Sequence, residues 1–461
     1  MEKIVLYPSP GIGHIISMVE LGKLLLSHSS SISSITILIT NFPLITGSYS
    51  SYISSVSSSF PSITFISLPP VPLLLGDASN YQDFEHIAFE ILRNNNPNIL
   101  KTLQSISPVS AFIIDFFCYP ALEISQSLKI PTYFFYTSGA SALAFFLNFP
   151  VFDKQSSDSF RNLNTCYQIP GLFSVPASHM IEPMLDRGVS YYEFIKMTQT
   201  LPKFDGIIVN TFEALEVRAV EGLKKGICLP GTLIPPIYCI GPLIANRGES
   251  GNSKDGERHE CLRWLDSQPS RSVVYLGFGS RGMFSKNQLS EIASGLEKSA
   301  VRFLWVVRAP PTPDPDLDQI LPEGFLERTK DRGHVVKSWV PQIAVLGHDS
   351  VGAFVSHCGW NSTLEAVDAG VPMVAWPLYA EQRFNKILLV EEIGIALPMN
   401  ESEDRFVSSS EIEIRLKQIM TSKEGDVVKK RMLDLKDKAR NTLKEGSANV
   451  ALSLLVKSWK Y

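Results

Sequence analysis

The sequence predicts two doubly wound α/β domains in tandem, and two observations point to this fold class. Short apolar runs alternate with longer amphipathic segments, which is typical of the strand–helix units that build parallel sheets. At 461 residues the chain is too long for one hydrophobic core and fits two domains of ordinary size. Ligands of such sheets bind at the carboxyl ends of the strands, and two facing sheets leave a cleft. We therefore expect function to reside in the strand-to-helix loops.

The first half of the chain carries apolar runs rich in β-branched and aromatic residues, separated by amphipathic stretches. Helices are expected at 15–26 and 83–95. The serine-rich patch at 47–59 has no usable periodicity and is interpreted as a surface loop. Strands are expected at 3–7, 34–40, 62–68, 111–116, 132–136 and 206–210.

The second half repeats this alternation after a polar, glycine-rich run at 241–258, which we interpret as a linker. Four prolines make 309–318 a loop. Strands are expected at 272–278, 303–307, 334–339, 352–356 and 372–376, and helices at 285–299, 341–347, 361–369, 381–392 and 425–459. The predicted domains are therefore 1–240 and 259–439, with the C-terminal segment 440–461 packing back onto the first domain.

The composition is that of a globular protein, with 44% hydrophobic and 19% charged residues. A net charge of −4, from 46 acidic and 42 basic residues, offers no broad cationic face, so nucleic acid and anionic membranes are not expected partners. Six scattered cysteines without a CxxC pair argue against a zinc ribbon or a disulfide framework. No signal peptide or membrane span is recognised, and we expect a cytoplasmic monomer with reduced thiols.

The first predicted strand runs into the loop PSPGIGH at 8–14. Gly11 and Gly13 allow a sharp turn there, and His14 falls at the start of the following helix. A neutral imidazole at that position faces the expected cleft and is available as a general base. Alternatively, His14 is a polar residue that caps its own helix.

Asp115 lies near the end of AFIIDFF, an otherwise apolar strand that should be buried. A buried carboxylate needs a partner, and the end of this strand can approach the loop that carries His14. Asp115 would then fix the tautomer of the imidazole and stabilise its protonated form. The alternative is a carboxylate that is bound by local backbone amides.

The run GFGSRG at 277–282 follows a strand and precedes a helix, so it fits a dinucleotide fingerprint. That interpretation requires an acidic residue at the end of the next strand, which instead ends at Arg308. The sequence therefore disfavours a nicotinamide-dependent dehydrogenase. The simpler interpretation is that Gly279 and Ser280 offer donors to a phosphate.

The strongest cluster of candidate residues is the stretch 339–382, called the signature segment below. Within it a strand runs into HCGWNS, and a helix begins near Asn361, which makes a site for a diphosphate. Trp339 offers a flat face to a base, and Glu365 can accept from ribose hydroxyls. The alternative is that its tryptophans are core residues and Glu381 a first-turn helix carboxylate. The other candidates here are His357, Gly359 and Ser362 for the diphosphate, and Glu381 and Gln382 for sugar hydroxyls.

The signature segment closely resembles the signature box of plant family-1 UDP-glycosyltransferases. It has the right length, 44 residues, and the landmarks WVPQ, HCGWNSTLEA, GVP and AEQ. The GxGH loop, the strand aspartate and the FGS turn also match. TYFFYTSGA, DGIIVNTFEALE and IYCIGPLI resemble the branch that acts on flavonoids, chalcones and related phenolics. The resemblance implies a GT-B fold, with the acceptor in the N-terminal domain and the nucleotide in the C-terminal domain.

The resemblance also implies roles for individual residues. His14 would be the general base and Asp115 its orienting partner. Trp339, with the Val340 backbone and Gln342 nearby, would bind uracil, and Glu365 the ribose. Diphosphate contacts would come from Ser280, His357, Gly359, Asn361 and Ser362, and sugar contacts from Gly13, Thr137, Trp360, Glu381 and Gln382.

Two positions of the signature segment indicate the sugar. Relatives that use UDP-glucuronate tend to carry Arg in place of Trp360, and relatives that favour galactose often carry His in place of Gln382. Glucose is therefore the expected sugar. The resemblance implies an inverting transfer from UDP-glucose to a phenolic hydroxyl, without metal or cofactor. Transfer to a ring carbon, or nucleotide-sugar binding without catalysis, remain alternatives.

Gly277 and Arg281 depart from the family pattern; Arg281 either adds charge near the diphosphate or points to solvent.

Overall fold

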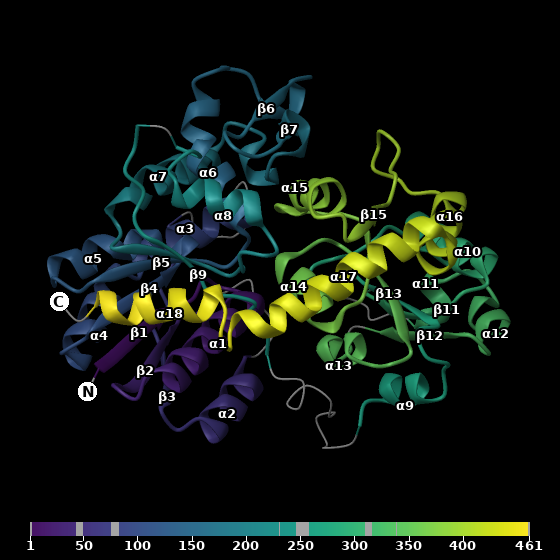
Figure 1. The fold of residues 1–461 in the computed structure, drawn as a ribbon, viewed down its shortest axis with the longest axis horizontal. Helices are drawn as coiled ribbons and strands as arrows, with labels where there is room; N and C mark the ends of the chain where they lie inside the picture. Colours follow the sequence, from purple (N-terminus) through teal and green to yellow (C-terminus); the bar gives the residue numbers. More distant parts are fainter. Residues whose placement is uncertain are drawn as a thin grey trace. The chain divides into compact units, whose positions relative to one another are not determined.

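The computed structural model describes residues 2–42, 49–74, 83–229, 231–245, 258–308, 316–337 and 339–459. The chain forms two compact units. The first unit comprises residues 1–244 together with 441–461, and the second comprises 245–440 (Figure 1). Most of the linker predicted at 241–258 and most of the loop predicted at 309–318 lie outside the described residues.

The first unit is built on a parallel sheet whose strands follow the order β3-β2-β1-β4-β5-β8-β9. Such an order needs right-handed crossover connections, which the intervening helices provide. Its strands are β1 (Glu2–Tyr7), β2 (Ile32–Ile39), β3 (Ile63–Ser67), β4 (Ala111–Asp115), β5 (Thr132–Tyr136), β8 (Gly206–Val209) and β9 (Ile237–Cys239).

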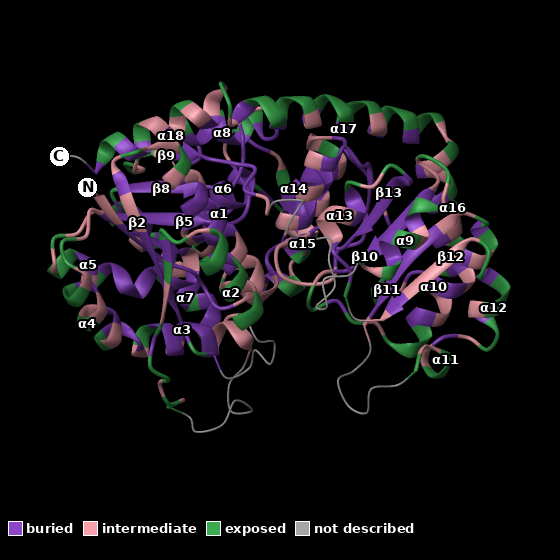
Figure 2. Cartoon of the chain, turned by 90° about the horizontal axis from the view of Figure 1, so that it is seen from below, coloured by how far each residue is buried: buried purple, intermediate pink, exposed green. Residues whose placement is uncertain are grey.

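Apolar side chains of α1, α2 and α18 pack with one face of this sheet into a single core. The central strands β4, β5 and β8 are buried throughout, as expected for a parallel sheet covered on both sides, whereas the edge strand β3 is mostly partly buried or exposed (Figure 2). A small hairpin, β6 (Cys166–Gln168) and β7 (Ser174–Pro176), lies apart from the sheet. The helices are α1 (Ile12–His28), α2 (Ser50–Ser59), α3 (Phe84–Asn94), α4 (Asn96–Ile106), α5 (Leu122–Ser127), α6 (Ala140–Asp153), α7 (Val189–Thr200), α8 (Val217–Lys224) and α18 (Ser447–Ser458), with 3₁₀ turns η2 (Phe116–Ala121), η3 (Phe160–Asn162), η4 (Ala177–His179), η5 (Glu182–Met184) and η6 (Leu201–Lys203).

The C-terminal helix α18 belongs to the first unit and contacts α1 and β9 (Figure 1). The ring of His28 bonds the Ser453 hydroxyl at 3.0 Å. Beyond the helix, the indole of Trp459 donates to the carboxylate of Glu2 at 3.1 Å. The first bond ties α18 to α1, and the second ties Trp459 to β1.

The second unit contains a parallel sheet of order β12-β11-β10-β13-β14-β15. Helices α10 and α16 pack against one face of it and share its core. Its strands are β10 (Val273–Gly277), β11 (Arg302–Val307), β12 (Gly333–Lys337), β13 (Val351–Ser356), β14 (Met373–Ala375) and β15 (Ala396–Pro398). Its helices are α9 (Glu260–Asp266), α10 (Lys286–Ser299), α11 (Leu317–Ile320), α12 (Phe325–Thr329), α13 (Gln342–Leu346), α14 (Trp360–Ala369), α15 (Gln382–Ile387), η8 (Leu388–Glu392, a π-helical turn), α16 (Ser409–Thr421) and most of α17 (Lys423–Thr442).

The predicted fold class, two doubly wound parallel sheets, is confirmed, but three local expectations were wrong. The serine-rich patch is not a loop, because Tyr52, Ile53 and Val56 recur at helical spacing and pack on the core as α2. The single helix expected at 425–459 is instead two helices. α17 ends at Thr442, and α18 begins at Ser447 after its N-cap residue Gly446. The segment 309–318 ends inside α11 rather than in a loop.

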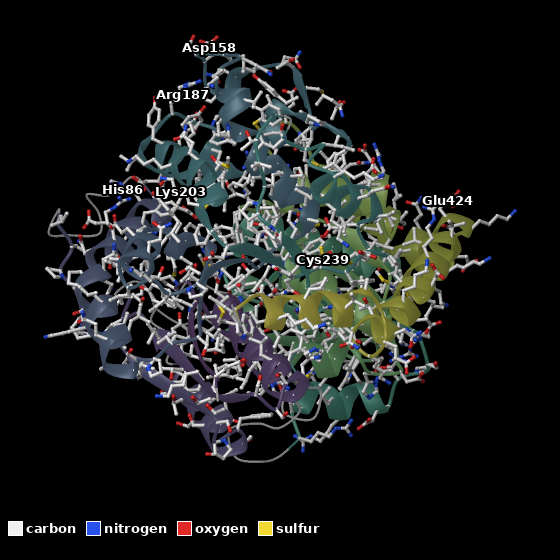
Figure 3. The ribbon with its side chains drawn as sticks, turned by 60° about the vertical axis from the view of Figure 1, so that its left-hand side comes forward. His86, Asp158, Arg187, Lys203, Cys239 and Glu424 are labelled. Carbon is white, nitrogen blue, oxygen red and sulfur yellow. The ribbon has the colours of Figure 1, made fainter. Side chains whose placement is uncertain are left out.

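All six cysteines are free, and Cys239 lies buried in β9 (Figure 3). Within the described ranges, no helix combines the length and the apolar character that crossing a bilayer demands.

Candidate active site

The first group of candidate residues gathers at the carboxyl edge of the first sheet. Tyr7 of β1 is in register with Ile114 of β4, so both strands end side by side. The loop after β1 leads into α1, whose first turn carries His14. The imidazole Nδ1 of His14 lies 3.0 Å from the Asp115 carboxylate. The predicted His–Asp pair is therefore present.

Asp115 is fully buried and its two oxygens have different partners. Oδ1 accepts from the Ser9 hydroxyl at 2.8 Å and from the Phe116 amide at 2.7 Å. Oδ2 faces His14. Both interpretations of this residue thus hold in part, since a local amide and the imidazole share the carboxylate. With Nδ1–H bound to Asp115, the basic nitrogen of neutral His14 is Nε2.

The surroundings of His14 are polar on one side and aromatic on another. The Thr137 hydroxyl lies 3.3 Å from Nδ1, which brings a third predicted residue to the pair. The imidazole is 5.7 Å from the ring of Phe116, which is only partly buried, and 6.1 Å from that of Phe117. Its side chain keeps 26% exposure. The geometry is suited to a base that works beside a flat apolar molecule. Gly13 lies next to His14 in the first turn of α1.

The second group of candidates surrounds the N-terminus of α14. Gly277 of β10 pairs with Ser356 of β13, so the loops after these strands are neighbours. The ring of His357 lies between them, and a Cβ added at either Gly279 or Gly359 would come within 2.5 Å of its Nε2. Glycine is therefore required at both positions by close approach. Ser280 is exposed beside Gly279, and Asn361 and Ser362 form the first turn of α14 with Trp360, which is buried.

His357 is neutral at physiological pH, because burial and then the Arg308 cation lower its pKa to about 4. Within the described part of the chain, its Nδ1 is buried without a hydrogen-bond partner. A neutral imidazole can offer one N–H to an anion without an opposing charge of its own. Arg308 follows β11 at the position where the dinucleotide interpretation required an acidic residue, so the site does not support that interpretation.

Arg281 does not simply point to solvent. Its guanidinium lies over the ring of Tyr379, 5.3 Å from the ring centre, and Tyr379 in turn is 6.1 Å from the ring of His357. The arrangement places a cation beside the turn that holds His357. The sequence did not decide between the two alternatives for Arg281, and it gave no sign of Tyr379. Tyr379 follows β14 and meets Arg281, which follows β10, only in the folded chain.

Gln342, at the start of α13, links several predicted residues. Its amide nitrogen donates to Glu365 at 2.7 Å and to Ser362 at 2.9 Å. Its amide oxygen accepts from the Tyr275 hydroxyl at 3.0 Å. Burial raises the pKa of Glu365 to about 7, although the bond from Gln342 acts in the opposite direction. The carboxylate is thus held in place and poorly solvated, which favours an incoming hydroxyl donor.

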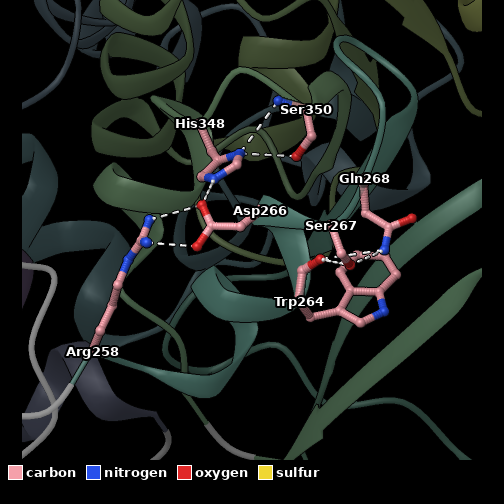
Figure 4. Close-up of polar contacts among 7 residues, drawn as sticks. All are labelled: Arg258, Trp264, Asp266, Ser267, Gln268, His348 and Ser350. Atoms are coloured by element: carbon pink, nitrogen blue, oxygen red, sulfur yellow. Dashed lines mark hydrogen bonds and ion pairs between the residues drawn. The ribbon is translucent and has the colours of Figure 1, made fainter.

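Trp339 is 54% exposed, while the next residue, Val340, is buried. The Trp339 and His259 rings form a T-shaped pair, with planes at 75° and centres 5.8 Å apart. His259 caps α9, and Asp266 at the other end of α9 bonds both Arg258 and His348 (Figure 4). The tryptophan therefore presents aromatic surface beside a helix that is fastened at its far end.

The last two candidates lie where β14 leads into α15. Gln382 is buried, and its side-chain oxygen accepts from the amides of Leu378 and Tyr379, both at 2.9 Å. It therefore shapes its own loop, a role that the sequence did not suggest. Glu381 is partly buried immediately before the helix. In the described residues, no group of three or more His, Cys, Asp or Glu side chains is arranged to hold a metal ion.

Comparisons with known proteins identify the family of this chain. A family model described as UDP-glucoronosyl and UDP-glucosyl transferase matches residues 234–437. The chain is 49% identical to UDP-glycosyltransferase 88B1 of Stevia rebaudiana, over 100% of this chain and 99% of that protein. It is 47% identical to a phloretin 2'-O-glucosyltransferase of Malus domestica, over 96% of each. The structure of Phytolacca americana UGT2 with UDP-2fluoro-glucose and pterostilbene matches with a TM-score of 0.89 and 35% identity, over 100% of both chains.

The solved relatives cover both units of this chain, so the fold is GT-B, as the resemblance implied. These two curated relatives are 49% and 47% identical to this chain over at least 96% of each sequence. The chain belongs to the UDP-glycosyltransferase family of plants.

Proposed function

We propose that this enzyme transfers glucose from UDP-glucose to a hydroxyl of a flavonoid, chalcone or related phenolic, with inversion at the anomeric carbon. The observation that carries the proposal is the His14–Asp115 pair at 3.0 Å beside aromatic side chains, in a chain whose second unit has the signature segment. Relatives named for O-transfer to phloretin, and a solved relative with a bound stilbene, support a phenolic acceptor.

In the proposed reaction the acceptor hydroxyl is bound by the first unit beside His14. Its proton passes to Nε2 as its oxygen forms a bond to the anomeric carbon. The bond from that carbon to the diphosphate breaks, and UDP leaves with the electron pair. Asp115 stabilises the imidazolium, and the N-terminus of α14 with His357 stabilises the departing anion. The proposal requires no metal or other cofactor, and it describes a cytoplasmic monomer without nucleic-acid partners.

In the second unit, the proposed donor contacts follow the positions of the side chains. Trp339 offers surface for uracil, and Glu365 accepts from the ribose hydroxyls. Trp360 and Gln382 favour glucose over glucuronate and galactose. Gln342 supports Glu365 and Ser362 rather than reaching the uracil itself, since both hydrogens of its amide are already donated. We propose further sugar contacts from Glu381 in this unit and from Gly13 and Thr137 in the first unit.

A screen of products tests the proposal. The enzyme is incubated with UDP-glucose, UDP-galactose or UDP-glucuronate and a mixed panel of flavonoids, chalcones and simple phenols, and products are identified by mass spectrometry. We expect hexosylated phenolics with UDP-glucose in preference to the other donors. Binding of UDP-glucose without any product across the panel would instead indicate a nucleotide-sugar binding protein.

Donor binding is expected to strengthen as the pH rises through about 7. Ribose hydroxyls bind the ionised form of Glu365, whose pKa is about 7, so binding of UDP-glucose releases a proton below this pH. The dissociation constant should rise by up to about tenfold for each pH unit below 7. His357, with a pKa of about 4, does not titrate in this range. Calorimetric titration with UDP-glucose at several pH values measures this dependence. The diphosphate of UDP-glucose has no proton that titrates near neutrality, so the ligand itself adds no pH dependence.

Glu365→Gln is the control for this pH dependence. The amide keeps the size of the side chain but cannot titrate, so the affinity of this variant should be weaker and nearly independent of pH. A wild-type affinity that stays constant between about pH 5.5 and 8 would contradict the assignment of Glu365 to the ribose.

A further inference from the structure

The hydroxyl of a buried tyrosine occupies the space that a side chain at Gly277 would need. Tyr275 and Gly277 lie two residues apart on β10, so they share one face of the strand. The Tyr275 ring is buried and stacks on Phe354 of β13, with ring centres 4.9 Å apart. A Cβ at Gly277 would lie 2.6 Å from the ring carbon that bears the hydroxyl. Gly277, one of the two departures from the family pattern, therefore leaves room for this hydroxyl.

The tyrosine hydroxyl reaches the amide of Gln342 and anchors its oxygen. It donates to the amide oxygen at 3.0 Å, while the amide nitrogen donates to Glu365 and Ser362. A flipped amide would turn its oxygen toward the ionised Glu365 carboxylate and lose the bond to it. Burial raises the pKa of Tyr275, so the phenol keeps its proton and remains the donor.

We infer that Tyr275 is a positioning residue for the donor: it holds Gln342, and through Gln342 it places Glu365 and Ser362 for the ribose and diphosphate. Gly277 is part of the same arrangement, because any side chain there would displace the Tyr275 hydroxyl. The inference rests on the proposed function, which assigns Glu365 and Ser362 to UDP-glucose. Tyr275 itself does not touch the donor in this account, and its effect passes entirely through the amide.

The first test measures UDP-glucose binding to Tyr275→Phe by calorimetry and then its steady-state kinetics. Loss of one buried hydrogen bond to a positioned amide should weaken donor binding by about five- to twentyfold. KM for UDP-glucose should rise by a similar factor while kcat stays within about twofold, since the base is untouched. Tyr133→Phe removes a comparable hydroxyl, which bonds Ser458 at 2.7 Å in the first unit, and should leave donor binding unchanged.

A double-mutant cycle separates positioning from a general loss of structure. If Tyr275 acts through Gln342, then Tyr275→Phe should have little further effect on donor affinity in a Gln342→Ala background. An equal loss in both backgrounds, or no loss in the single variant, would overturn the inference. Gly277→Ala should weaken donor binding at least as much as Tyr275→Phe, because the added methyl displaces the ring.

The binding readout also separates this inference from the proposed function. A wild-type enzyme that binds UDP-glucose but transfers nothing would refute the transferase proposal, and the cycle would still decide the role of Tyr275. A wild-type enzyme that does not bind UDP-glucose would overturn both.

Discussion

Replacing His14 with alanine is expected to lower kcat for a weakly acidic phenolic acceptor by ~10²–10⁴-fold, the usual effect of losing a positioned base. The acceptor oxygen then attacks without a group to take its proton. UDP-glucose affinity should remain near that of the wild type, because His14 lies in the first unit and the proposed uracil, ribose and diphosphate contacts lie in the second. Single-turnover kinetics with a saturating donor measures the expected loss in the rate of transfer.

His28→Ala is the matched control, since this histidine lies in the same helix and bonds Ser453 rather than Asp115. It should leave turnover unchanged. Asp115→Asn should also reduce kcat, because the amide can hold the imidazole in the wrong tautomer. Near-normal turnover by His14→Ala would contradict its role as the general base. The acceptor must be weakly acidic, because an acidic phenol loses its proton with less help from a base.

Replacing Gly279 with alanine should abolish measurable donor binding under ordinary assay conditions. Its backbone has φ +72°, which costs a residue with a side chain roughly 1–2 kcal/mol. The added methyl would also press on the His357 ring from 2.5 Å, and overpacking of this kind costs roughly 1–3 kcal/mol. Relief of the clash displaces the ring or the loop, and both belong to the proposed diphosphate site.

Two further glycines separate the contributions. Gly226 has φ +67° with nothing within 4 Å of an added Cβ, so Gly226→Ala carries the backbone cost alone and should bind UDP-glucose normally. Gly359 has φ −64°, which suits alanine, so Gly359→Ala carries only the clash with His357. Unchanged donor affinity in both Gly279→Ala and Gly359→Ala, measured by calorimetry, would contradict the placement of the diphosphate.

The sequence was sufficient to predict the fold class and the meeting of His14 with Asp115. Both residues follow from local patterns, a glycine loop after one strand and a carboxylate at the end of another. Parallel pairing then brings the ends of those strands together. The signature segment was recognisable for the same reason, since its residues follow one another around a strand and a helix start.

The missed features depend on contacts between residues far apart in the chain. Ser9 binds Asp115 across 106 positions, and Tyr275 binds Gln342 across 67, so neither bond leaves a local pattern. The strands β9 and β15 were not predicted; each is three residues long and so shows little alternation, although the equally short β14 was predicted within the longer apolar run 372–376. The helix α2 was hidden by its serines, which outnumber the apolar residues that hold it to the core.

The anomeric configuration of the product tests the proposed inverting transfer. The enzyme is supplied with UDP-glucose, whose sugar is α-linked, and a phenolic acceptor from the screen, and the purified product is examined by proton NMR and acid hydrolysis. A single displacement with His14 as base predicts a β-linked O-glucoside that releases glucose in acid. An α-linked product would contradict the inverting displacement, and an acid-stable carbon-linked product would contradict transfer to oxygen.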